Sequence, residues 1–177
     1  MKKINYCSQC GSAQLIQKVP EGDTHSRIVC EACHIIHYQN PKIVTGCLPI
    51  WEDKVLLCKR AIEPRSGFWT LPGGFMENNE TVLQAAARET WEEAEAKVEQ
   101  LQLYLVVSGS NKNQVYMVFL AQLCDLTFAP GIESLEVQLF SQEEIPWEEI
   151  AFRFVHQTLT DYFQDRIKGQ FPVRVIS

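Results

Sequence analysis

The stretch Gly73–Ala96 constrains the fold of this chain more than any other part of the sequence. A Pro-Gly-Gly run at its start is unsuited to a continuing helix or strand, so we expect the backbone to turn sharply there. Thr81 and Gln84 have the spacing of a capping box, in which each side chain bonds to the main chain of the other residue at a helix start. The sequence therefore predicts a sharp turn and then a helix that begins near Thr81 and ends near Ala94.

Three glutamates gather on one face of this helix. At about 100° per residue, Glu89, Glu92 and Glu93 fall within roughly 100° of one another. Carboxylates crowded in this way repel each other, and a divalent cation would neutralise them. A solvated acidic face is the plainer alternative, but the Pro-Gly-Gly run and Glu80 at the helix start favour the cation. The opposite face is apolar and consists of Leu83, Ala87, Trp91 and Ala94.

Such an open carboxylate cluster suits Mg²⁺. This ion prefers octahedral oxygen ligation, keeps several waters, and is typically held by a few carboxylates together with phosphate oxygens of a substrate. Bound ions would neutralise and orient a diphosphate and lower the pKa of an attacking water. The predicted chemistry is displacement at phosphorus, in which positioning and charge neutralisation supply most of the catalysis.

Two cysteine pairs near the N-terminus indicate a second metal site. Cys7 and Cys10 form one C-x-x-C pair, and Cys30 and Cys33 form another. Four thiolates from two tight turns suit tetrahedral Zn²⁺, and this zinc would be structural because the protein fills all four positions. Four unrelated reduced cysteines are the alternative. Nearby histidines are expected to be surface or packing residues: His25, His34 and His37.

Composition limits the partners and the compartment. The formal net charge of −6 gives no general basic field for nucleic-acid phosphates, so nucleic acid is not expected as a partner. The N-terminus lacks the apolar segment of a secretory signal, and no apolar run reaches the length of about 18 residues that a membrane span needs. Seven cysteines in such a chain fit a reducing compartment, and the cytoplasm is the predicted location.

Hydrophobic patterning outlines the rest of the chain. Residues 55–58 form a continuous apolar run, as expected for a strand covered on both faces, and Pro49 predicts that the preceding strand ends there or lies at an edge. Polar residues 108–114 read as a hairpin tip between two β segments. The segments expected to be strands are 42–51, 54–60, 101–107, 115–123 and 137–140, and those expected to be helical are 143–150 and 152–168.

The stretch around the carboxylate helix resembles the signature of the Nudix hydrolases. That signature is a glycine, five residues, a glutamate, seven residues, Arg-Glu, an apolar residue, one further residue, Glu-Glu, one further residue, a glycine and an apolar residue. Two positions depart from it: Thr90 stands where an aliphatic residue is usual, and Glu95 replaces the second glycine. Glu95 in a left-handed conformation would cost roughly 1 kcal/mol; alternatively the helix runs on. The matching residues are Gly74, Glu80, Arg88, Glu89, Glu92 and Glu93.

The resemblance spans about residues 40 to 165 and implies roles for the matching residues. Glu89, Glu92 and Glu93 would be catalytic residues and ligands of Mg²⁺ or Mn²⁺, and the Gly73 carbonyl a further ligand. Gly74, Glu80 and Arg88 would support the site, with Arg88 as partner to a glutamate of the signature. Family members often recruit another glutamate from a later loop, for which Glu136 fits best and Glu133 second.

The same resemblance implies the fold and the domain organisation. It predicts an α+β Nudix fold, an α/β/α sandwich with a mixed β-sheet, at residues 39–177. A small zinc ribbon at residues 1–38 would precede it. Family members often form homodimers.

The combination of a zinc ribbon and a Nudix domain narrows the resemblance to plant-type FAD and ADP-ribose pyrophosphatases. It implies hydrolysis of a nucleoside diphosphate linked to a further group, with release of AMP. NADH pyrophosphatases share the layout, but their downstream SQPWPFP signature is absent here. The alternatives are NADH pyrophosphatase activity and a non-catalytic nucleotide sensor; RNA decapping is disfavoured by the acidic charge. Aromatic residues that could stack on a base, or pack in the core instead, are Phe68, Trp69, Tyr104 and Tyr116.

Overall fold

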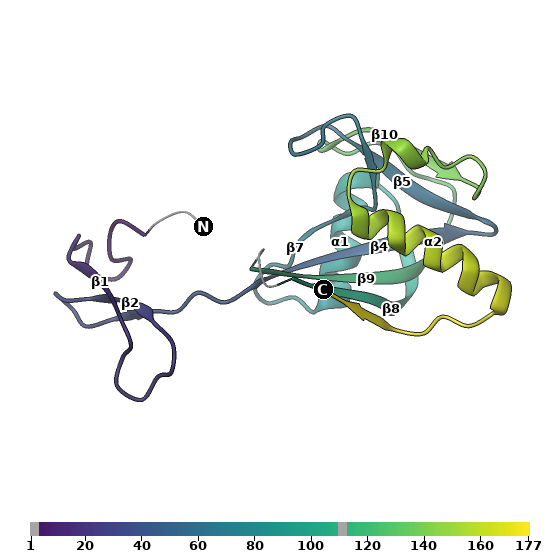
Figure 1. Cartoon of the computed structure of the whole chain (residues 1–177). Helices are drawn as coiled ribbons and strands as arrows, with labels where there is room; N and C mark the ends of the chain where they lie inside the picture. Colours follow the sequence, from purple (N-terminus) through teal and green to yellow (C-terminus); the bar gives the residue numbers. More distant parts are fainter. Residues whose placement is uncertain (1–3, 110–112) are drawn as a thin grey trace. The chain divides into compact units, whose positions relative to one another are not determined.

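The structure is a computed structural model that describes residues 4–109 and 113–177 (Figure 1). The chain divides into two compact units between Asn40 and Pro41. We propose that these units correspond to the expected domains at residues 1–38 and 39–177. Among the described residues, no helix combines the length and the apolar character that crossing a membrane would require.

The N-terminal unit is a small antiparallel sheet with two cysteine turns. Its strands, β1 (Leu15–Lys18), β2 (Arg27–Cys30) and β3 (Ile36–His37), lie in sequence order. The Gly11 N–H donates to the Cys7 carbonyl at 2.9 Å, and the His34 N–H donates to the Cys30 carbonyl at 2.8 Å. Gly11 and His34 have φ angles of 74° and 61°. Each C-x-x-C pair is therefore closed by one left-handed residue, which is a glycine only in the first pair.

The second unit is built on one mixed sheet. Its strands run in the order β10-β5-β4-β9-β8-β11, with β6 added beside β5 and β7 beside β4. The β4–β9 and β8–β11 pairs are parallel, and the other pairs are antiparallel. The bounds are β4 Lys42–Trp51, β5 Lys54–Arg60, β6 Trp69–Thr70, β7 Gly73–Phe75, β8 Val98–Ser108, β9 Gln114–Leu123, β10 Ser134–Phe140 and β11 Arg174–Ile176.

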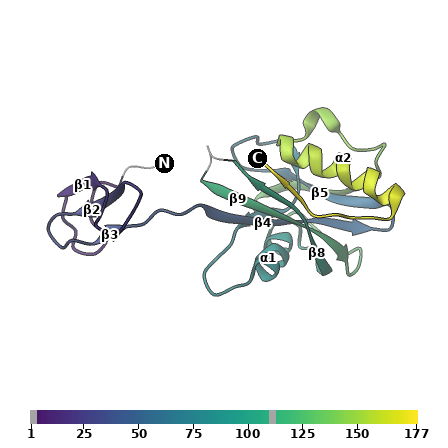
Figure 2. The same ribbon diagram turned by 60° about the horizontal axis from the view of Figure 1, so that its bottom comes forward.

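Two helices cover opposite faces of this sheet (Figure 2). They are α1 (Val82–Ala94) and α2 (Arg153–Lys168). Along β4, Cys47 packs in a cluster with Ala86 of α1, whereas Leu48 packs in a cluster with Leu159 of α2. Consecutive side chains of a strand point to opposite faces, so both faces are covered, and the fully buried run at residues 55–58 is explained in the same way. The prediction of an α/β/α sandwich with a mixed sheet is confirmed.

The prediction that Pro49 ends its strand or places it at an edge is wrong. β4 is a central strand and continues through Pro49, which lies in register with Ala121 of β9. On the other side, β4 pairs with β7 at residues 44–46 and with β5 at residues 50 and 51. Pro49 lies between these two paired segments, where no partner strand needs the N–H that proline lacks.

Several expected boundaries change in the second half of the chain. Within residues 143–150, only a 3₁₀ helix at Trp147–Glu149 (η1) forms, because Pro146 interrupts the segment. The strand expected at residues 137–140 begins earlier, at Ser134. The hairpin tip expected at residues 108–114 includes residues 110–112, which lie outside the described residues; β8 ends at Ser108 and β9 begins at Gln114.

Helix α1 buries a different face from the apolar one that the sequence displays. Leu83 and Trp91 remain 45% and 49% exposed. Most of the side chains that α1 buries are small, and two of them are polar or charged. The buried residues are Ala85, Ala86, Thr90, Glu93 and Ala94. The Thr90 hydroxyl donates to the Ala86 carbonyl at 2.8 Å. A polar residue is therefore accommodated at this departure from the signature, because its hydroxyl is satisfied within the helix.

Both ends of α1 are defined by local interactions. The Gln84 N–H donates to the Thr81 hydroxyl at 3.2 Å and the Thr81 N–H donates to the Gln84 side chain at 2.8 Å, which confirms the predicted capping box. At the other end Glu95 adopts the left-handed conformation, with φ 48°, and its N–H donates to the Trp91 carbonyl at 2.7 Å. The helix therefore stops where the glycine of the signature would stop it, at the cost of a strained glutamate.

We expect Glu95→Gly to raise the free energy of unfolding by about 1 kcal/mol, because glycine adopts the left-handed conformation without a Cβ clash. Urea denaturation of the wild type and the variant measures this difference. Glu95→Ala removes the charge but keeps the Cβ atom and should give no such gain. An equal gain in both variants would show that charge, not backbone strain, is responsible.

Candidate active site

The candidate active site rests on a close approach of β4 and β7. Gly46 and Gly73 pair across these strands. A Cβ atom on Gly73 would lie 2.7 Å from the Thr45 carbonyl oxygen and 2.8 Å from the Gly46 Cα atom, distances that no side chain tolerates. The Cys47 N–H donates to the Pro72 carbonyl at 3.1 Å. The Pro-Gly-Gly run thus forms a short strand rather than only a turn, and its glycines allow main chain to lie against main chain.

Of the three helix glutamates, Glu93 is buried beside β7 and Glu89 is half-buried there. Glu93 is 8% exposed, and its carboxylate accepts a hydrogen bond from the Gly73 N–H at 3.2 Å. Burial raises the pKa of Glu93 to about 7 and also raises the pKa of Glu89. The Glu89 carboxylate passes over Gly74, where a Cβ atom would overlap it. Glu92 lies further out, with its side chain 55% exposed.

Arg88 connects these glutamates to the loop before the helix. Its Nε and Nη2 atoms donate to the two carboxylate oxygens of Glu80 at 3.0 and 2.7 Å, and Nη2 also donates to the Phe75 carbonyl at 3.1 Å. Its Nη1 atom donates to Glu89 at 2.8 Å and to Glu92 at 2.9 Å. These bonds match the five N–H donors of a guanidinium. The Arg88 bonds, together with the Glu77 N–H, lower the pKa of Glu80 to about 2.

The structure places Glu133, and not Glu136, beside the helix glutamates. From Glu136 onward β10 pairs regularly with β5, and Val137 packs in the same cluster as Ala94 of α1. Glu136 therefore points to the other face, where it lies 4.0 Å from the Lys59 ammonium. For this reason we now prefer Glu133 to Glu136 as the candidate for the later glutamate. The charge of Glu133 adds to burial in raising the pKa of Glu93.

Main-chain bonds hold the loop that carries Glu133 against the end of α1. The Ala129 N–H donates to the Ala94 carbonyl at 2.9 Å, and the Gly131 N–H donates to the Glu93 carbonyl at 3.1 Å. A Cβ atom on Gly131 would overlap the Glu92 carbonyl oxygen. The loop thus caps the helix with its own backbone, and Glu133 follows two residues later.

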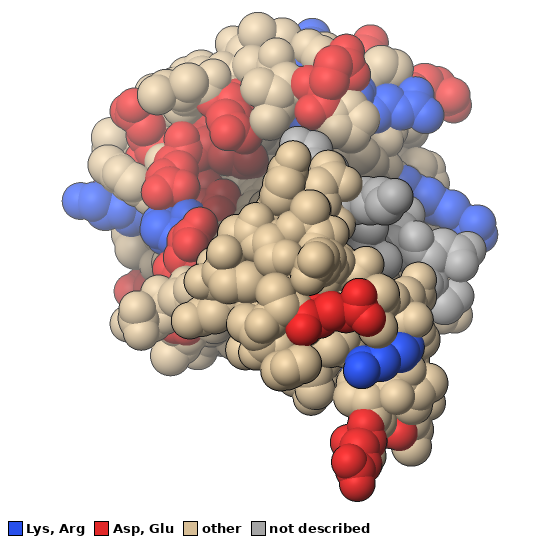
Figure 3. Space-filling model, turned by 90° about the vertical axis from the view of Figure 1, so that its left-hand side faces the viewer, with Lys and Arg blue, Asp and Glu red and all other residues tan. Residues whose placement is uncertain are grey.

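Together these residues surround an open cleft of about 1080 Å³. We call it the carboxylate cleft. Figure 3 shows acidic side chains gathered around a hollow on one face of the molecule. The residues of the cleft that carry charge are Arg60, Glu77, Arg88, Glu89, Glu92, Glu93, Glu95 and Glu133. Gly73 lines the same cleft, so its carbonyl remains a predicted ligand.

A second hollow of about 440 Å³, which we call the aromatic cavity, adjoins the carboxylate cleft. Its aromatic lining comes from β7, β9 and the start of α2: Phe75, Tyr116, Phe152 and Phe154. The Tyr116 hydroxyl donates to the Gln114 side chain at 2.8 Å. Both hollows are lined by Arg60, Gly73, Gly74 and Phe75, which therefore form a shared wall.

The aromatic residues singled out in the sequence are mostly elsewhere. Trp69 is 4% exposed and packs edge-on against Phe140 in the core, so stacking on a substrate is excluded by burial. Tyr104 is also in the core, and its hydroxyl donates to Asp165 at 2.7 Å. Phe68 lines neither hollow and carries the Arg65 guanidinium over its ring. Only Tyr116 lines the aromatic cavity.

Sequence reasoning missed Arg60, Phe75, Phe152 and Phe154. Phe152 and Phe154 stand at the start of the segment expected to be helical at residues 152–168, and no local pattern shows that the start of α2 borders a cavity. Arg60 ends a strand, and its side chain contacts Pro64 in the following loop and Phe152 just before α2. The one sequence feature that could have pointed to Arg60 is weak: it is an arginine at the end of a buried apolar strand.

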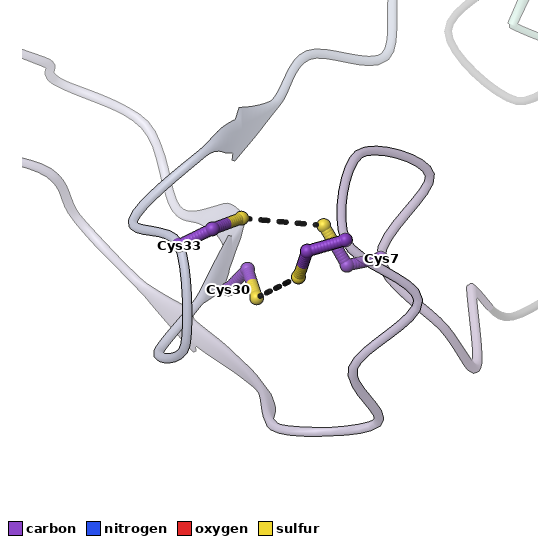
Figure 4. Close-up of side chains that lie close together, drawn as sticks. Cys7, Cys30 and Cys33 are labelled. Atoms are coloured by element: carbon purple, nitrogen blue, oxygen red, sulfur yellow. Dashed lines mark hydrogen bonds between the residues drawn. The ribbon is translucent and has the colours of Figure 1, made fainter.

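The four predicted zinc ligands lie together in the N-terminal unit. The sulfur atoms of Cys7, Cys10, Cys30 and Cys33 are all within 4.8 Å of one another. The Cys7–Cys33 and Cys10–Cys30 sulfur distances are both 3.6 Å (Figure 4). Tetrahedral Zn²⁺ with bonds of about 2.3 Å separates its sulfur ligands by about 3.8 Å, so the cluster fits this ion. Within the described residues, no histidine belongs to the cluster.

Comparison with known proteins agrees with this geometry. The family profile described as NUDIX domain matches residues 40–162. The chain belongs to the Nudix family. A second profile, described as Nudix N-terminal, matches residues 5–39 and contains all four clustered cysteines.

Proteins similar to this Nudix chain include NAD-capped RNA hydrolases and an ADP-ribose pyrophosphatase. The chain is 25% identical over 171 residues to the NAD-capped RNA hydrolase NudC of Vibrio parahaemolyticus, covering 93% of the chain and 63% of the relative. It is 29% identical over 119 residues to the ADP-ribose pyrophosphatase of Methanocaldococcus jannaschii, covering 65% of the chain and 69% of the relative. The chain spans between 52% and 63% of the length of the first three NudC relatives.

A crystal structure of a NUDIX hydrolase from Nitrosomonas europaea is also similar, with 57% identity and a TM-score of 0.93. The alignment covers 98% of both chains. The two-unit layout of ribbon and Nudix domain is therefore shared over the full matched length.

The cysteine cluster generates a prediction for the N-terminal unit. The purified protein should contain one Zn²⁺ per chain, and Cys10→Ser should lose most of it, because a tetrahedral structural site needs all four ligands. Metal analysis gives the zinc content, and hydrogen exchange should show that residues 4–40 become unprotected in the variant. Cys124→Ser, which removes an exposed thiol outside the cluster, should keep its zinc. Full zinc content in Cys10→Ser would contradict the assignment.

Proposed function

We propose that this Nudix hydrolase cleaves the phosphoanhydride of a nucleoside diphosphate derivative, with the nucleoside in the aromatic cavity and the diphosphate at the carboxylate cleft. The observation that carries the proposal is the shared wall. Arg60 and Gly73–Phe75 line both hollows, so the two hollows are direct neighbours. Acidic and aromatic surfaces side by side match a ligand with a charged centre and a planar ring.

The carboxylates of Glu89, Glu92, Glu93 and Glu133 fit a hard divalent cation such as Mg²⁺ or Mn²⁺. All four line one open cleft, and burial already works against the ionised form of two of them. When bound, the ion supplies charge neutralisation at the diphosphate and a water of lowered pKa. The fit rests on oxygen donors in an open cluster, which leaves positions for water and phosphate oxygens.

The remaining residues position these groups. The Gly73 N–H holds one oxygen of Glu93 against β7, and Arg88 holds Glu89 and Glu92 toward the cleft through its Nη1 atom. Because Arg88 is fixed by both oxygens of Glu80, the carboxylates are aligned before a substrate arrives. Such preorganisation lowers the reorganisation needed during phosphoryl displacement.

The preferred substrate is proposed from the relatives and from the cavity. FAD, ADP-ribose and NAD(H) all contain AMP joined through a phosphoanhydride, so the aromatic cavity would hold the same adenine in each. The relatives named for ADP-ribose and for NAD-capped RNA support hydrolysis of ADP-ribose and of NAD-type compounds as the two leading candidates. Because NudC acts on NAD-capped RNA, as its name states, the net charge of −6 does not exclude an RNA that carries a 5′ NAD. FAD rests on the sequence resemblance alone.

A non-catalytic sensor is not supported by the two departures from the signature. Thr90 bonds within the helix and Glu95 ends it as glycine would, so neither displaces a carboxylate. We further propose a cytoplasmic location, as expected from the cysteine content, and a homodimer, as the family resemblance implies.

With Mg²⁺ or Mn²⁺, the zinc-loaded protein should release AMP from at least one of ADP-ribose, FAD, NAD and NADH, or nicotinamide mononucleotide from 5′-NAD RNA, as measured by chromatography. Glu93→Gln should lower kcat by about 100-fold or more, because the variant keeps the shape of the side chain but loses the ligand charge. Absence of turnover on the whole panel, or undiminished turnover in the variant, would contradict the proposal.

The two later glutamates provide a matched comparison. Glu133→Gln should lower kcat/KM by at least about 10-fold at fixed Mg²⁺ and raise the Mg²⁺ concentration needed for half-maximal activity. Glu136→Gln should change neither value, because Glu136 faces the opposite side of the sheet. The reverse ranking would show that β10 turns its other face to the metal.

A further inference from the structure

Arg60 has a geometry suited to binding an anion at the wall between the two hollows. It ends β5 and is half-buried. Its Nε atom donates to the Pro64 carbonyl at 2.8 Å, and its Cζ atom lies 5.2 Å from the centre of the Phe152 ring. The hydrogen bond and the aromatic face together fix the plane of the guanidinium, so little conformational freedom remains to be lost on binding.

The terminal nitrogen atoms of Arg60 are available. Within residues 4–109 and 113–177, the one hydrogen bond of its side chain is the one from Nε, and it takes part in no ion pair. Arg88 is the other basic residue that lines the carboxylate cleft in this part of the chain, and its donors are used by Glu80, Glu89, Glu92 and Phe75. Arg60 is thus the cationic group with donors left for a ligand.

The charge of Arg60 acts on both hollows. Burial raises the pKa of Glu93 in the carboxylate cleft and of Tyr116 in the aromatic cavity, and the Arg60 charge opposes both shifts. One guanidinium therefore lies within electrostatic range of a buried carboxylate on one side and a cavity-lining phenol on the other. A ligand with its planar ring in the aromatic cavity and an anionic group at the carboxylate cleft would therefore contact Arg60.

We propose that Arg60 forms a phosphate-binding site at the shared wall and holds the phosphate attached to the nucleoside in the aromatic cavity. The guanidinium fork pairs with two phosphate oxygens, as is usual for arginine. Arg60 is a positioning residue: by fixing the first phosphate it sets which phosphorus atom lies over the carboxylates. This inference rests on the proposed function, since it takes a nucleoside phosphate as the ligand.

A packing role is the alternative, and the chain offers a control for it. Arg65, in the loop after β5, also carries its guanidinium over an aromatic ring, at 5.3 Å from the centre of Phe68. It lines neither the carboxylate cleft nor the aromatic cavity. Loss of an arginine that stacks on a phenylalanine is therefore matched in Arg65→Ala, without loss of the proposed phosphate contact.

The test compares AMP with adenosine as probes, by calorimetric titration of the zinc-loaded full chain without added Mg²⁺. The wild type should bind AMP at least about 10-fold more tightly than adenosine, because the charged pair forms only with AMP. Arg60→Ala should remove most of this ratio and leave adenosine affinity unchanged. Arg60→Lys, which keeps the charge but not the fork, should retain part of it, and Arg65→Ala should retain all of it.

Three results would overturn the inference: a wild type that binds AMP no better than adenosine, a parallel loss of adenosine affinity in Arg60→Ala, or an equal change in Arg65→Ala. Hydrolysis assays on the same preparations separate this inference from the proposed function. If the wild type hydrolyses none of the panel but shows the Arg60-dependent ratio, the proposed function fails alone. If it hydrolyses a substrate but the ratio is independent of Arg60, the inference fails alone.

Discussion

The hydrogen bonds of Arg88 are the interaction on which the rest of the site depends. One guanidinium contacts the end of β7, the loop before α1 and two glutamates of α1 itself. Without this cation the carboxylates of the helix and of the loop before it would repel one another. A planar cation with five fixed donors can satisfy all of them at once, which an ammonium could not. The acidic cluster is therefore held in place by one internal cation.

The buried carboxylates show what this arrangement costs the fold. Glu93 lies beneath the cleft with one main-chain donor and no cationic hydrogen-bond partner among the described residues, and burial raises its pKa toward neutrality. A residue chosen for stability alone would be apolar at this position. The small residues that α1 packs on β4, and the glycines of β4 and β7, bring the charged side chains close to the main chain. The proposed metal-binding function explains this placement of charged side chains, which packing alone does not.

The sequence predicted the local structure of the site well and its tertiary partners poorly. The capping box at Thr81, the end of α1 at Ala94 and the grouping of the four cysteines depend on spacing along the chain, which is readable directly. The preference for Glu136 over Glu133 depended on which face of β10 each side chain occupies. A register shift between Ser134 and Glu136 breaks the simple alternation, so the sequence does not show which residues face α1. The expectations of a strand end at Pro49 and of base stacking by Trp69 did not hold for a related reason. The neighbours of both residues come from segments far away in the sequence.

The loop before β10 illustrates how this site can tolerate change. From Ala129 onward it is fastened to the end of α1 by the backbone N–H groups of Ala129 and Gly131. Most of its side chains are thus free to vary during evolution while the loop keeps its path, provided that position 131 stays small. Related chains could exchange the residues around Glu133, and with them the shape of the cleft rim, without rebuilding the carboxylate cluster. This loop is a place where new substrate preferences can arise on an unchanged catalytic frame.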